Sequence, residues 1–458
     1  MNPLRVLMVT YSFPPAGGVG VLRAASLARY FPAEGIQLDV LTARNASAVG
    51  SDQTLLDEIP DDVKIHRSFT LDLPFGIKKG IKKLIAGVKP TAGKAAGTVA
   101  AGSKPNFLKR ALEDVLLPDP QVTWLPVAAR AARRIVRERN IDLVLITAPP
   151  FSNILLAEKL RKAFPFPAIV IDFRDEWLST TIDLVSFSRS KRARRVARNA
   201  EASAVINATT VVAVTEAARR EIRARYPKEP ENKFQLIPNG YDSTRLRRSA
   251  SARKPQPGGR ITVTHVGTVY ASTDPTTLVE ALQSLPPEMK SRFRLRFIGH
   301  IEEPRFREAL LQLGEMVELK GFLPQHEALA AMNETDYALL ITHDPLNVAA
   351  KFYDYIGAGK PILATVNPNG EVRRLLEELR AGWWAGSRDV EGIRRLFVEV
   401  ATRNDALLAS YRPDLEKIAQ YERKILAQRY AGLLHSIAER QRERASHAST
   451  AQSFGTGD

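Results

Sequence analysis

The sequence predicts an α/β protein made of two doubly wound, Rossmann-like domains with a ligand-binding cleft between them. Three observations support this class. The chain has 458 residues, which is too long for one ordinary hydrophobic core. Short apolar runs alternate with helical patterns in both halves, as in βαβ units with parallel sheets. A stretch rich in proline, charge and asparagine, Tyr226 to Gly259, separates the two series.

The first series begins at the N-terminus. Leu4 to Val9 predicts a strand, a glycine-rich turn follows, and apolar residues then recur at helical spacing up to Gly35. Residues 1–218 are therefore predicted to form the N-terminal domain. Its further strands and helices are expected in QLDVLTA, AARAARRIVRERN, DLVLITAPP, NILLAEKLRKAF, AIVIDFRDEW and TTVVAVTEAARREI.

The second series predicts a C-terminal domain over residues 241–408, with residues 219–240 as the linker. Its strands are expected in RITVTHVGT, RLRFIGH, VELKGF, YALLITH and KPILATV. An amphipathic pattern in DLEKIAQYERKILAQRYAGLLHSIAERQ makes residues 409–444 a C-terminal helix, expected to return to the N-terminal domain. Residues 445–458 lack an apolar pattern and are expected to be disordered.

The composition narrows the functional classes. The absence of cysteine excludes disulfides, thiolate metal sites and a cysteine nucleophile. No secretory signal pattern and no run of about 18 apolar residues is present, so a cytoplasmic location is expected. Lys and Arg number 66 against 50 Asp and Glu, a net charge of +16 that favours an anionic partner.

The glycine-rich turn is PPAGGVG, residues 14–20, and contains Gly17, Gly18 and Gly20. Glycines before a helix expose unpaired backbone N–H groups to a phosphate. Two other interpretations stay open on this segment alone. One is a tight turn that requires positive φ. The other is a nicotinamide enzyme with Asp39 as the ribose-binding acid, although the spacing departs from G-x-G-x-x-G.

A second pattern of interest is LNVAAKFYDYIGAGKPILAT in the C-terminal half. Its spacing puts Lys351 and Asp354 on one face of a predicted helix, about one turn apart. If the start of the helix points at the cleft, the Lys351 ammonium could bind a diphosphate and the Asp354 carboxylate could bind a sugar hydroxyl. The alternative is an i,i+3 ion pair on a solvated face.

Six segments together resemble the GT-B fold glycosyltransferases of family 4, which retain the anomeric configuration of a nucleotide-sugar donor. They occur in the family's order from residue 4 to about 435. The resemblance implies transfer of a sugar to a glycan or lipid-linked acceptor, in cell-surface polysaccharide or glycolipid synthesis. The segments are VLMVTYSFPPAGGVGVLRAASLARYF, DFRDEW (172–177), LIPNGYD (236–242), HVGTVYASTDPTTLVEAL (265–282), GFLPQHEAL (321–329) and KFYDYIGAGKPIL (351–363).

The resemblance also implies roles for individual residues. Backbone amides and cations would stabilise the leaving diphosphate, so neither a metal nor a cofactor is expected and the nucleotide-sugar is a substrate. The candidate catalytic residues are Lys351, Asp354 and Arg174. The candidate donor-binding residues are Gly17, Gly18, Gly20, Gly267, Thr268, Gly321, Phe322, Asn347 and Glu371.

The chain departs from the family pattern in its charged residues. The second acid of the family's Glu-x7-Glu signature falls on Asp354, but the first falls on Leu346, so Asn347 or another cleft group would have to replace it. The family's Arg and Lys after the first strand of the second domain are missing from GTVYASTDP. Lys351, and next Arg174, are the expected replacements.

Several alternatives remain at these positions. Arg174 could instead pair with Asp172 and Asp175 and brace its own loop. The family's histidine of the N-terminal domain is absent around Asn153, and His265 is expected to be a polar loop residue rather than a catalyst, as is His300. The missing residues also leave open a non-catalytic nucleotide-sugar or membrane-binding protein on this scaffold, or a GT-B nucleotide-sugar epimerase.

Two segments concentrate the positive charge, residues 75–89 and 188–198. The first has isoleucine and leucine at helical spacing with lysines on the flanks, which suits an anionic membrane surface. A helix packed on its own domain with solvated lysines is the alternative. Neither segment is interleaved with aromatic residues, so nucleic acid is not expected as a partner. The prediction is a cytoplasmic protein that can bind peripherally to the inner face of the cell membrane.

Overall fold

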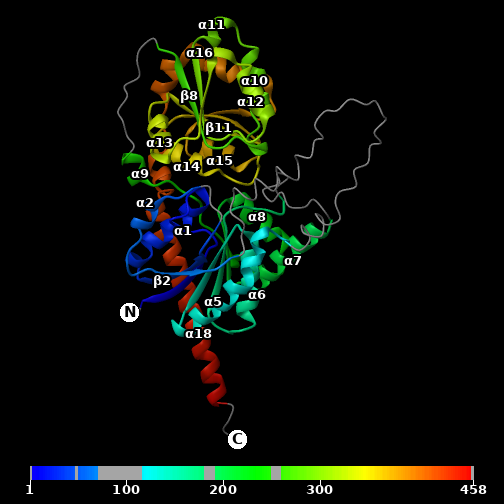
Figure 1. The fold of residues 1–458 in the computed structure, drawn as a ribbon, viewed down its shortest axis with the longest axis vertical. Coiled ribbons are helices and arrows are strands. Elements are labelled where there is room, and N and C mark those ends of the chain that lie inside the picture. Colours follow the sequence, from blue (N-terminus) through cyan, green and yellow to red (C-terminus); the bar gives the residue numbers. More distant parts are fainter. Residues whose placement is uncertain (1–2, 47–49, 71–115, 180–190, 249–258, 455–458) are drawn as a thin grey trace, which may run out of the picture.

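The computed structural model describes residues 3–46, 50–70, 116–179, 191–248 and 259–454. They form two sheets in which every strand pairing is parallel. Figure 1 shows one domain above the other, with the C-terminal domain at the top. Hydrophobic clusters cover both faces of each sheet. The predicted class of two doubly wound, Rossmann-like domains is confirmed.

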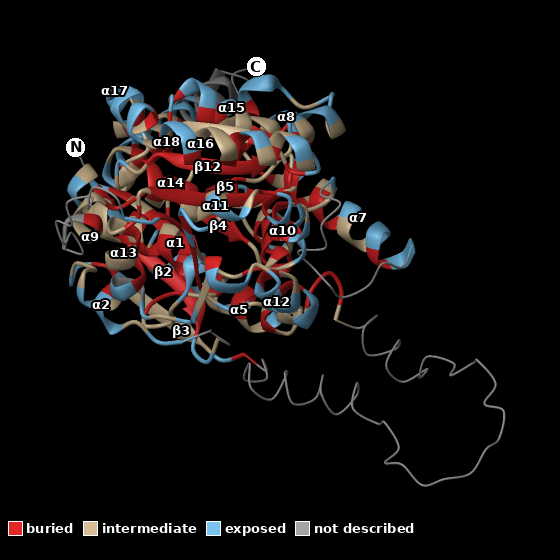
Figure 2. Cartoon of the chain, turned by 90° about the horizontal axis from the view of Figure 1, so that it is seen from above, coloured by how far each residue is buried: buried red, intermediate tan, exposed pale blue. Residues whose placement is uncertain are grey.

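Seven strands form the N-terminal sheet, in the order β3-β2-β1-β4-β5-β6-β7. Most are continuous apolar runs because helices cover both faces, and Figure 2 shows this interior as buried. The strands are β1 (Leu4–Val9), β2 (Ile36–Ala43), β3 (Lys64–Ser68), β4 (Leu143–Ala148), β5 (Ala168–Phe173), β6 (Thr210–Ala213) and β7 (Phe234–Leu236). The helices are α1 (Val19–Tyr30), α2 (Gln53–Asp57), α5 (Leu125–Glu138), α6 (Leu156–Arg161), α7 (Lys191–Asn207) and α8 (Glu216–Arg225).

Six strands form the C-terminal sheet, in the order β10-β9-β8-β11-β12-β13. The strands are β8 (Ile261–Val266), β9 (Phe293–Ile298), β10 (Val317–Gly321), β11 (Tyr337–Thr342), β12 (Ile362–Val366) and β13 (Gly382–Gly386). The helices that follow β7 along the chain are α9 (Ser243–Arg248), α10 (Thr276–Gln283), α11 (Pro287–Lys290), α12 (Pro304–Leu311), α13 (Gln325–Asn333), α14 (Ala350–Gly357), α15 (Glu371–Glu378), α16 (Val390–Ser410), α17 (Leu415–Ala419) and α18 (Arg423–Phe454).

The domain boundary differs from the sequence prediction. Residues 219–240 were expected to be linker, but they contain most of α8 and all of β7. β7 extends the N-terminal sheet, with Phe234 opposite Val211 of β6. The chain therefore crosses to the second domain only after Leu236. A three-residue strand next to proline and charge carries too weak an alternation to be recognised from the sequence.

The chain crosses between the domains twice, and the two crossings lie side by side. The Tyr241 amide donates to the Tyr421 carbonyl at 3.1 Å, and the Arg423 amide donates back to the Tyr241 carbonyl at 2.9 Å. Gly240 is required there, because a Cβ atom would lie 2.0 Å from the Tyr421 carbonyl oxygen. These paired segments form the hinge between the domains.

After the hinge, α18 packs along the N-terminal domain, where Leu426, Tyr430, Leu434 and Ile437 join the core of β1, β2 and α1. Figure 1 shows the helix in red, running down this domain and beyond it. The structure differs from the sequence prediction for residues 445–458, since α18 continues to Phe454. The preceding residues QRER (441–444) and Ala445, Ala448 and Ala451 are good helix formers, and a helix that is already nucleated propagates without a packed face.

Candidate functional site between the two sheets

Each sheet has one point where the strand order reverses. In the N-terminal sheet it lies between β1 and β4, and in the C-terminal sheet between β8 and β11. The carboxyl ends of the strands at such a point diverge and leave a crevice where α/β proteins bind ligands. The loops that follow the strands of the two sheets meet across the domain boundary. The two crevices therefore open into one interdomain cleft.

The glycine-rich turn follows β1 at the first reversal point. Gly18 has φ of 100° and precedes α1, so the turn requires the freedom of glycine here. Gly18 and Gly20 are exposed, and a Cβ at Gly18 would meet nothing within 4 Å. The N–H groups of Val19 and Gly20 make no hydrogen bond to the described residues. Gly17 differs, because its N–H donates to the Gly50 carbonyl at 2.8 Å and is not available to a phosphate.

Arg174 fixes this turn against the neighbouring loop. Its guanidinium donates to the carbonyl oxygens of Gly20, Ala148 and Pro149, which join the first turn of α1 to the end of β4. The pairing of Arg174 with Asp172, which the sequence left open as an alternative, does not occur. Asp172 instead accepts two bonds from Arg23, at 2.8 and 2.9 Å. Arg174 thus holds the reversal point together, and burial lowers its pKa.

Lys351 lies in the first turn of α14, at the second reversal point. Its Nζ is 3.0 Å from Nε2 of His265, and a Cβ on Gly267 would lie 3.1 Å from Nζ. Nδ1 of His265 is 3.2 Å from the Leu339 carbonyl. Since that carbonyl can only accept, Nδ1 carries the proton and Nε2 accepts from the lysine. Burial lowers the pKa of Lys351 to about 7 and that of His265 well below its usual value.

His265 was expected to be a polar loop residue, but it is fully buried inside β8. The sequence contained only a weak indication that His265 is buried. His265 is a polar, titratable residue in a strand that is buried along most of its length, so it needs a specific partner. For His265 that partner is Lys351. The histidine accepts from the Lys351 amine and so holds Nζ beside Gly267.

Asp354 does not share the environment of Lys351, although both belong to α14. Burial raises the pKa of its carboxyl to about 6, and Arg423 opposes this rise while Asp242 adds to it. These neighbours belong to the hinge. Among the described residues, Lys351 and Asp354 form no ion pair. The predicted common face is thus divided between the cleft and the hinge, because residues three apart on a helix point in directions that differ by about 60°, which lets them contact different neighbours.

Asn347 and Glu371 connect the domains. Oδ1 of Asn347 accepts from the Glu176 amide at 2.9 Å, while its Nδ2 donates to Asp344 at 3.0 Å. Oε1 of Glu371 accepts from the Glu216 amide at 3.3 Å. A third bond runs from the Thr215 hydroxyl to the Leu346 carbonyl at 2.7 Å. The two predicted donor-binding residues therefore hold the cleft closed in this conformation.

Glycines end three neighbouring strands of the second sheet. Gly267, Gly299 and Gly321 follow β8, β9 and end β10, and all have positive φ. A Cβ on Gly299 would lie 2.3 Å from the Gly267 carbonyl oxygen, so the loops can pack this closely only through glycine. Thr268 follows Gly267 and is half-buried. The sheet edge thus presents bare backbone beside Lys351.

Phe322 follows Gly321 and is 61% exposed. Its ring stacks on that of His300, with centroids 5.2 Å apart and planes at 14°. Both residues follow the carboxyl ends of strands, at the edge of the same crevice. An exposed aromatic surface of this kind suits a nucleotide base. A base-binding role for Gly321 and Phe322 stays a prediction.

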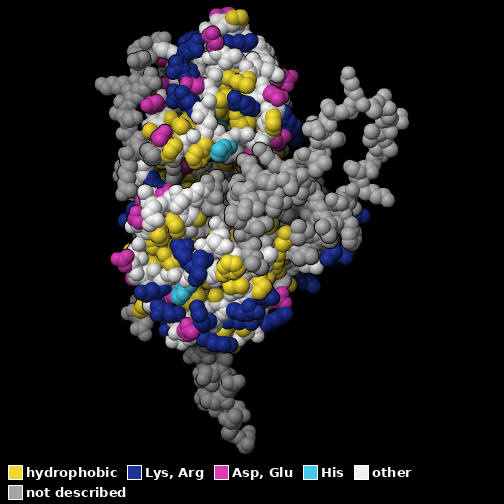
Figure 3. All heavy atoms as spheres, viewed as in Figure 1, with side chains coloured by type: hydrophobic (Ala, Val, Ile, Leu, Met, Phe, Trp, Pro, Cys, Tyr) yellow, Lys and Arg dark blue, Asp and Glu magenta, His cyan; other side chains and the backbone are white. Residues whose placement is uncertain are grey.

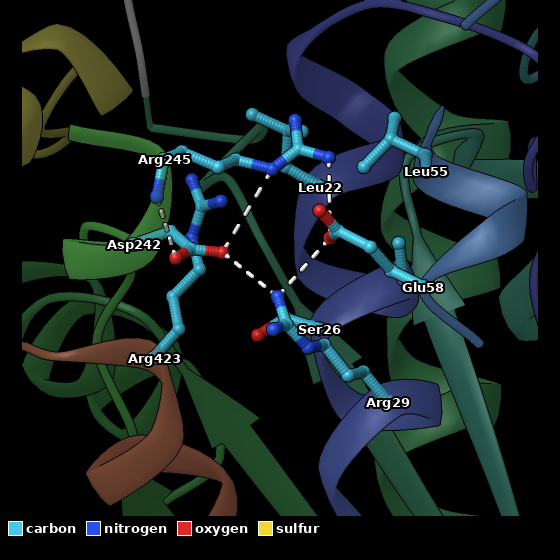
Figure 4. A pocket seen from close by; sticks show the side chains of 9 residues that line it. Leu22, Ser26, Arg29, Leu55, Glu58, Asp242, Arg245 and Arg423 are labelled. Carbon is cyan, nitrogen blue, oxygen red and sulfur yellow. Dashed lines mark hydrogen bonds and ion pairs between the residues drawn. The ribbon is translucent and has the colours of Figure 1, made fainter. Parts of the chain in front are cut away.

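The hinge holds a second group of charges, shown in Figure 4, and a small pocket. Arg29 lies 3.1 Å from Glu58 and 3.4 Å from Asp242, and Arg245 lies 3.3 Å from Glu58 and 3.8 Å from Asp242. Arg423 donates to the Gly240 carbonyl at 2.9 Å. We call these five residues the hinge cluster. Opposite charges alternate around it, and no sequence motif indicated it.

Two further predictions concern cofactors. Asp39 lies in the middle of β2, where His66 is 2.6 Å and Arg139 is 3.4 Å from its oxygens. It is thus occupied and buried, which argues against the ribose-binding acid of a nicotinamide enzyme. Within residues 3–46, 50–70, 116–179, 191–248 and 259–454, no group of three or more His, Cys, Asp or Glu could hold a metal ion. That the reaction needs no metal stays a prediction.

The structure describes only part of the two basic segments on which the membrane prediction depends. Residues 75–89 lie outside the described residues, as do 188–190 of the second basic segment. No helix in the described part of the chain is long and apolar enough to cross a membrane.

Comparisons with known proteins agree with this geometry. Residues 98–245 match the family model described as Glycosyltransferase Family 4. A putative colanic acid biosynthesis glycosyltransferase, WcaL of Salmonella typhimurium, is 26% identical over 219 residues, which cover 45% of this chain and 52% of that protein. The match thus spans about half the length of this curated relative.

Solved structures match over almost the whole chain. A glycosyltransferase from Rickettsia africae has a TM-score of 0.61 at 13% identity, covering 95% of this chain and 99% of its own. HepE of Anabaena, in complex with UDP and glucose, has a TM-score of 0.60 at 14% identity, covering 94% and 100%. WaaG, a glycosyltransferase involved in lipopolysaccharide biosynthesis, has 0.53 at 15% identity, covering 95% and 98%.

At these identities the solved structures establish the fold, while the family model adds the sequence relationship. The resemblance drawn from the six sequence segments is confirmed: the chain has the two-domain GT-B fold along its length and resembles the family 4 glycosyltransferases, whose own model it matches over residues 98–245.

Proposed function

We propose that the protein is a glycosyltransferase that moves a sugar from a nucleotide-diphosphate-sugar to a glycan or lipid-linked acceptor. The observation that carries the proposal is the pair of reversal points in sheets whose loops meet at the domain boundary, with free amides at Val19 and Gly20 in one domain and Lys351 in the other. The relatives named for colanic acid and lipopolysaccharide biosynthesis support a role in cell-surface polysaccharide or glycolipid synthesis.

The arrangement suits the departure of a diphosphate. When the bond between the anomeric carbon and the phosphate oxygen breaks, negative charge grows on the diphosphate. In this proposal the first-turn amides of α1 and the Lys351 ammonium stabilise that charge. The acceptor oxygen forms the new bond to the anomeric carbon, and the proton of the acceptor hydroxyl passes to the leaving diphosphate. Retention of the anomeric configuration is the outcome that the family resemblance favours. No metal or cofactor is part of the proposal.

Donor hydrolysis tests this function without knowledge of the acceptor. The protein is incubated with UDP-, GDP-, ADP- and TDP-sugars, and release of the nucleoside diphosphate is measured. We expect slow release from one donor and a loss of about 100-fold in Lys351→Ala. Lys320→Ala is the matched control, since Lys320 is an exposed lysine of β10 in a surface pair with Glu318. Release that is absent with every donor, or equal in both variants, would contradict the proposal.

A non-catalytic nucleotide-sugar-binding protein is the second candidate. It is favoured by Leu346 at the place of the first family acid and by Asn347, whose side chain is occupied by Glu176 and Asp344. Such a protein would bind a nucleotide-sugar and leave it intact. A GT-B epimerase would instead return the donor with an altered sugar, which product analysis in the same experiment would reveal.

We also propose that the N-terminal domain binds an anionic membrane surface at the inner face of the cell membrane. Figure 3 shows Lys and Arg side chains gathered on the part of this domain that lies away from the cleft. On α7, Lys191, Arg195 and Arg198 are exposed. Each cation near an anionic surface contributes about 1 kcal/mol, so Arg195→Glu combined with Arg198→Glu should weaken binding to anionic vesicles. Unchanged flotation with such vesicles would contradict this.

A further inference from the structure

The segment DFRDEW, residues 172–177, comprises the last two residues of β5 and the start of the loop that follows, and it holds almost all of its side chains in fixed contacts. Asp172 is fully buried and bound by Arg23, Phe173 belongs to the core, and Arg174 is held by three carbonyl oxygens. The loop is therefore rigid on the side where it leaves the strand.

The other end of the loop is fixed just as firmly. The Glu176 carboxylate is 2.7 Å from Arg225 and accepts from the Ser179 amide at 2.9 Å. The Trp177 indole donates to Glu201 at 2.8 Å and stacks on Phe151 with ring centroids 4.1 Å apart. The loop thus has rigid anchors before and after position 175.

Asp175 is the exception. Among the described residues, its carboxylate makes no hydrogen bond and no ion pair, although the side chain is half-buried. Its backbone is held between the Arg174 amide, which donates to Ala148 at 2.8 Å, and the Glu176 amide, which donates to Asn347 at 2.9 Å. A carboxylate on a backbone this firmly fixed is held at a defined place in the interdomain cleft.

The charged groups that face Asp175 do not compensate it. Arg174 on its own loop stabilises the carboxylate, but Asp344 of the other domain repels it. Across the cleft, burial raises the pKa of the Tyr270 hydroxyl, and the charges of Asp175 and Asp344 add to this rise. Burial raises the pKa of Asp175 to about 6. The folded protein therefore accommodates a carboxylate that costs stability, which is common where a ligand supplies the missing partner.

The chemistry of that ligand follows from the surroundings. An anionic phosphate would be repelled by Asp175 and Asp344 together, so this place differs from the diphosphate site at Lys351 and the α1 turn. A neutral group that donates a hydrogen bond is the partner that a lone carboxylate needs. In a protein that handles sugars, that group is a carbohydrate hydroxyl.

We infer that Asp175 accepts a hydrogen bond from a carbohydrate hydroxyl in the cleft and that the DFRDEW loop is built to present it. The inference deepens the proposed function and rests on it. The hydroxyl has two sources, the sugar of the donor and the sugar of the acceptor. No proton transfer is required, because the carboxylate only orients the bound sugar.

The test compares binding to the wild type, Asp175→Asn and Asp175→Ala by calorimetry. Three probes are used: UDP, GDP, ADP and TDP alone, the matching nucleotide-sugar, and methyl glycosides of common hexoses added with the nucleoside diphosphate. Asp62→Asn is the matched control, because Asp62 is an exposed carboxylate outside the cleft. Thermal unfolding of each variant checks that it is folded.

We expect nucleoside diphosphate affinity to stay within about twofold in both variants of Asp175. Affinity for one of the two sugar-bearing probes should fall roughly 10- to 100-fold, as for loss of a hydrogen bond to a charged group. A fall with the nucleotide-sugar assigns the donor, and a fall with the glycoside assigns the acceptor. Unchanged affinity for both, or an equal fall for the bare nucleoside diphosphate, would overturn the inference alone. A wild type that binds no nucleoside diphosphate would overturn the proposed function and the inference with it.

Discussion

The hinge cluster and the cleft differ in how their charged residues are paired. At the hinge, Arg29 and Arg245 each contact both Glu58 and Asp242, so each of these four charges has partners of opposite sign. In the cleft, Lys351 contacts a neutral histidine and Asp175 has no partner among the described residues. Both regions lie between the same two domains, so their positions alone do not explain the difference.

This difference indicates that the charged residues of the hinge have a structural role and those of the cleft a functional one. Paired charges at the hinge join the segments that the chain must keep together while the domains move. Single charges in the cleft have their pKa values shifted toward neutrality because burial is not compensated. Such groups gain stabilisation only when a ligand arrives. Four predictions, from the largest effect to the smallest, test this contrast.

The largest effect is expected at a paired charge close to the hinge. Arg23 binds Asp172 and also donates to the carbonyls of Ile237 and Pro238. Arg23→Met would leave a fully buried carboxylate unpaired, and we expect a loss of about 3–5 kcal/mol in the free energy of unfolding. Denaturant titration measures it. Arg220→Met, which removes an exposed partner of Glu216, should cost less than about 1 kcal/mol. Equal losses in the two variants would contradict the contrast.

The second prediction concerns protons. Lys351 has a pKa of about 7 in the free protein, and a bound diphosphate favours the ammonium form. Below pH 7 the lysine is already charged. Above it, binding must protonate the amine, so affinity should fall by up to about tenfold per pH unit as pH rises.

Calorimetry at pH 8 in buffers of different ionisation enthalpy measures this uptake. The nucleoside diphosphate is fully ionised there, since its second pKa is about 6. We expect close to one proton bound per nucleotide in the wild type and none in Lys351→Met. Equal proton uptake by the wild type and Lys351→Met would contradict the prediction, because the proton would then bind to a group other than Lys351. Replacing His265 by Asn should weaken the pH dependence, because the amine loses the acceptor that holds it in place.

The sequence predicted the fold well because its signals are local. Buried parallel strands are continuous apolar runs, and Gly18 marks the turn into α1 by a backbone angle that other residues avoid. The site was predicted only in part. Lys351 and the glycines were found by their place relative to a strand or helix.

The partners of those residues were not found, since they come from distant parts of the chain. Asp172 pairs with Arg23, which lies 149 residues away, rather than with its neighbour Arg174. Asn347 contacts Glu176, which lies 171 residues away in the sequence. The spacing of residues in a motif therefore cannot reveal its role in the contact between the domains. It could not be predicted either that the Asp175 carboxylate lacks a partner among the described residues. This depends on the neighbouring polar groups being bonded to other residues.

The third prediction addresses the contacts that close the cleft. Asn347→Ala removes both of its bonds to Glu176, at 2.9 and 3.4 Å. We expect a loss of about 1 kcal/mol in domain closure and a larger radius of gyration in small-angle scattering without ligand. Saturating nucleotide should restore the wild-type value. A radius that does not change on substitution would show that the hinge alone sets the closure.

The smallest effect is expected at Asp175. Its pKa is about 6 in the folded protein and about 4 when unfolded, so folding favours the protonated form. Stability from this group is unaffected below pH 4 and falls as pH rises from 4 to 6. Asp175→Asn should therefore unfold at a slightly higher temperature than the wild type at pH 7, and at nearly the same temperature at pH 4. A variant that is less stable at pH 7 would mean that Asp175 is structural.

One measurement tests the central claim that the cleft holds a diphosphate through Lys351 and the α1 turn. Thermal unfolding is followed with UDP, GDP, ADP and TDP for the wild type, Lys351→Met and Lys320→Met. We expect one nucleotide, at about 100 times its Kd, to raise the midpoint of the wild type and of Lys320→Met by a few degrees. Lys351→Met should show no shift. The same shift in Lys351→Met, or no shift with any nucleotide in the wild type, would contradict the account.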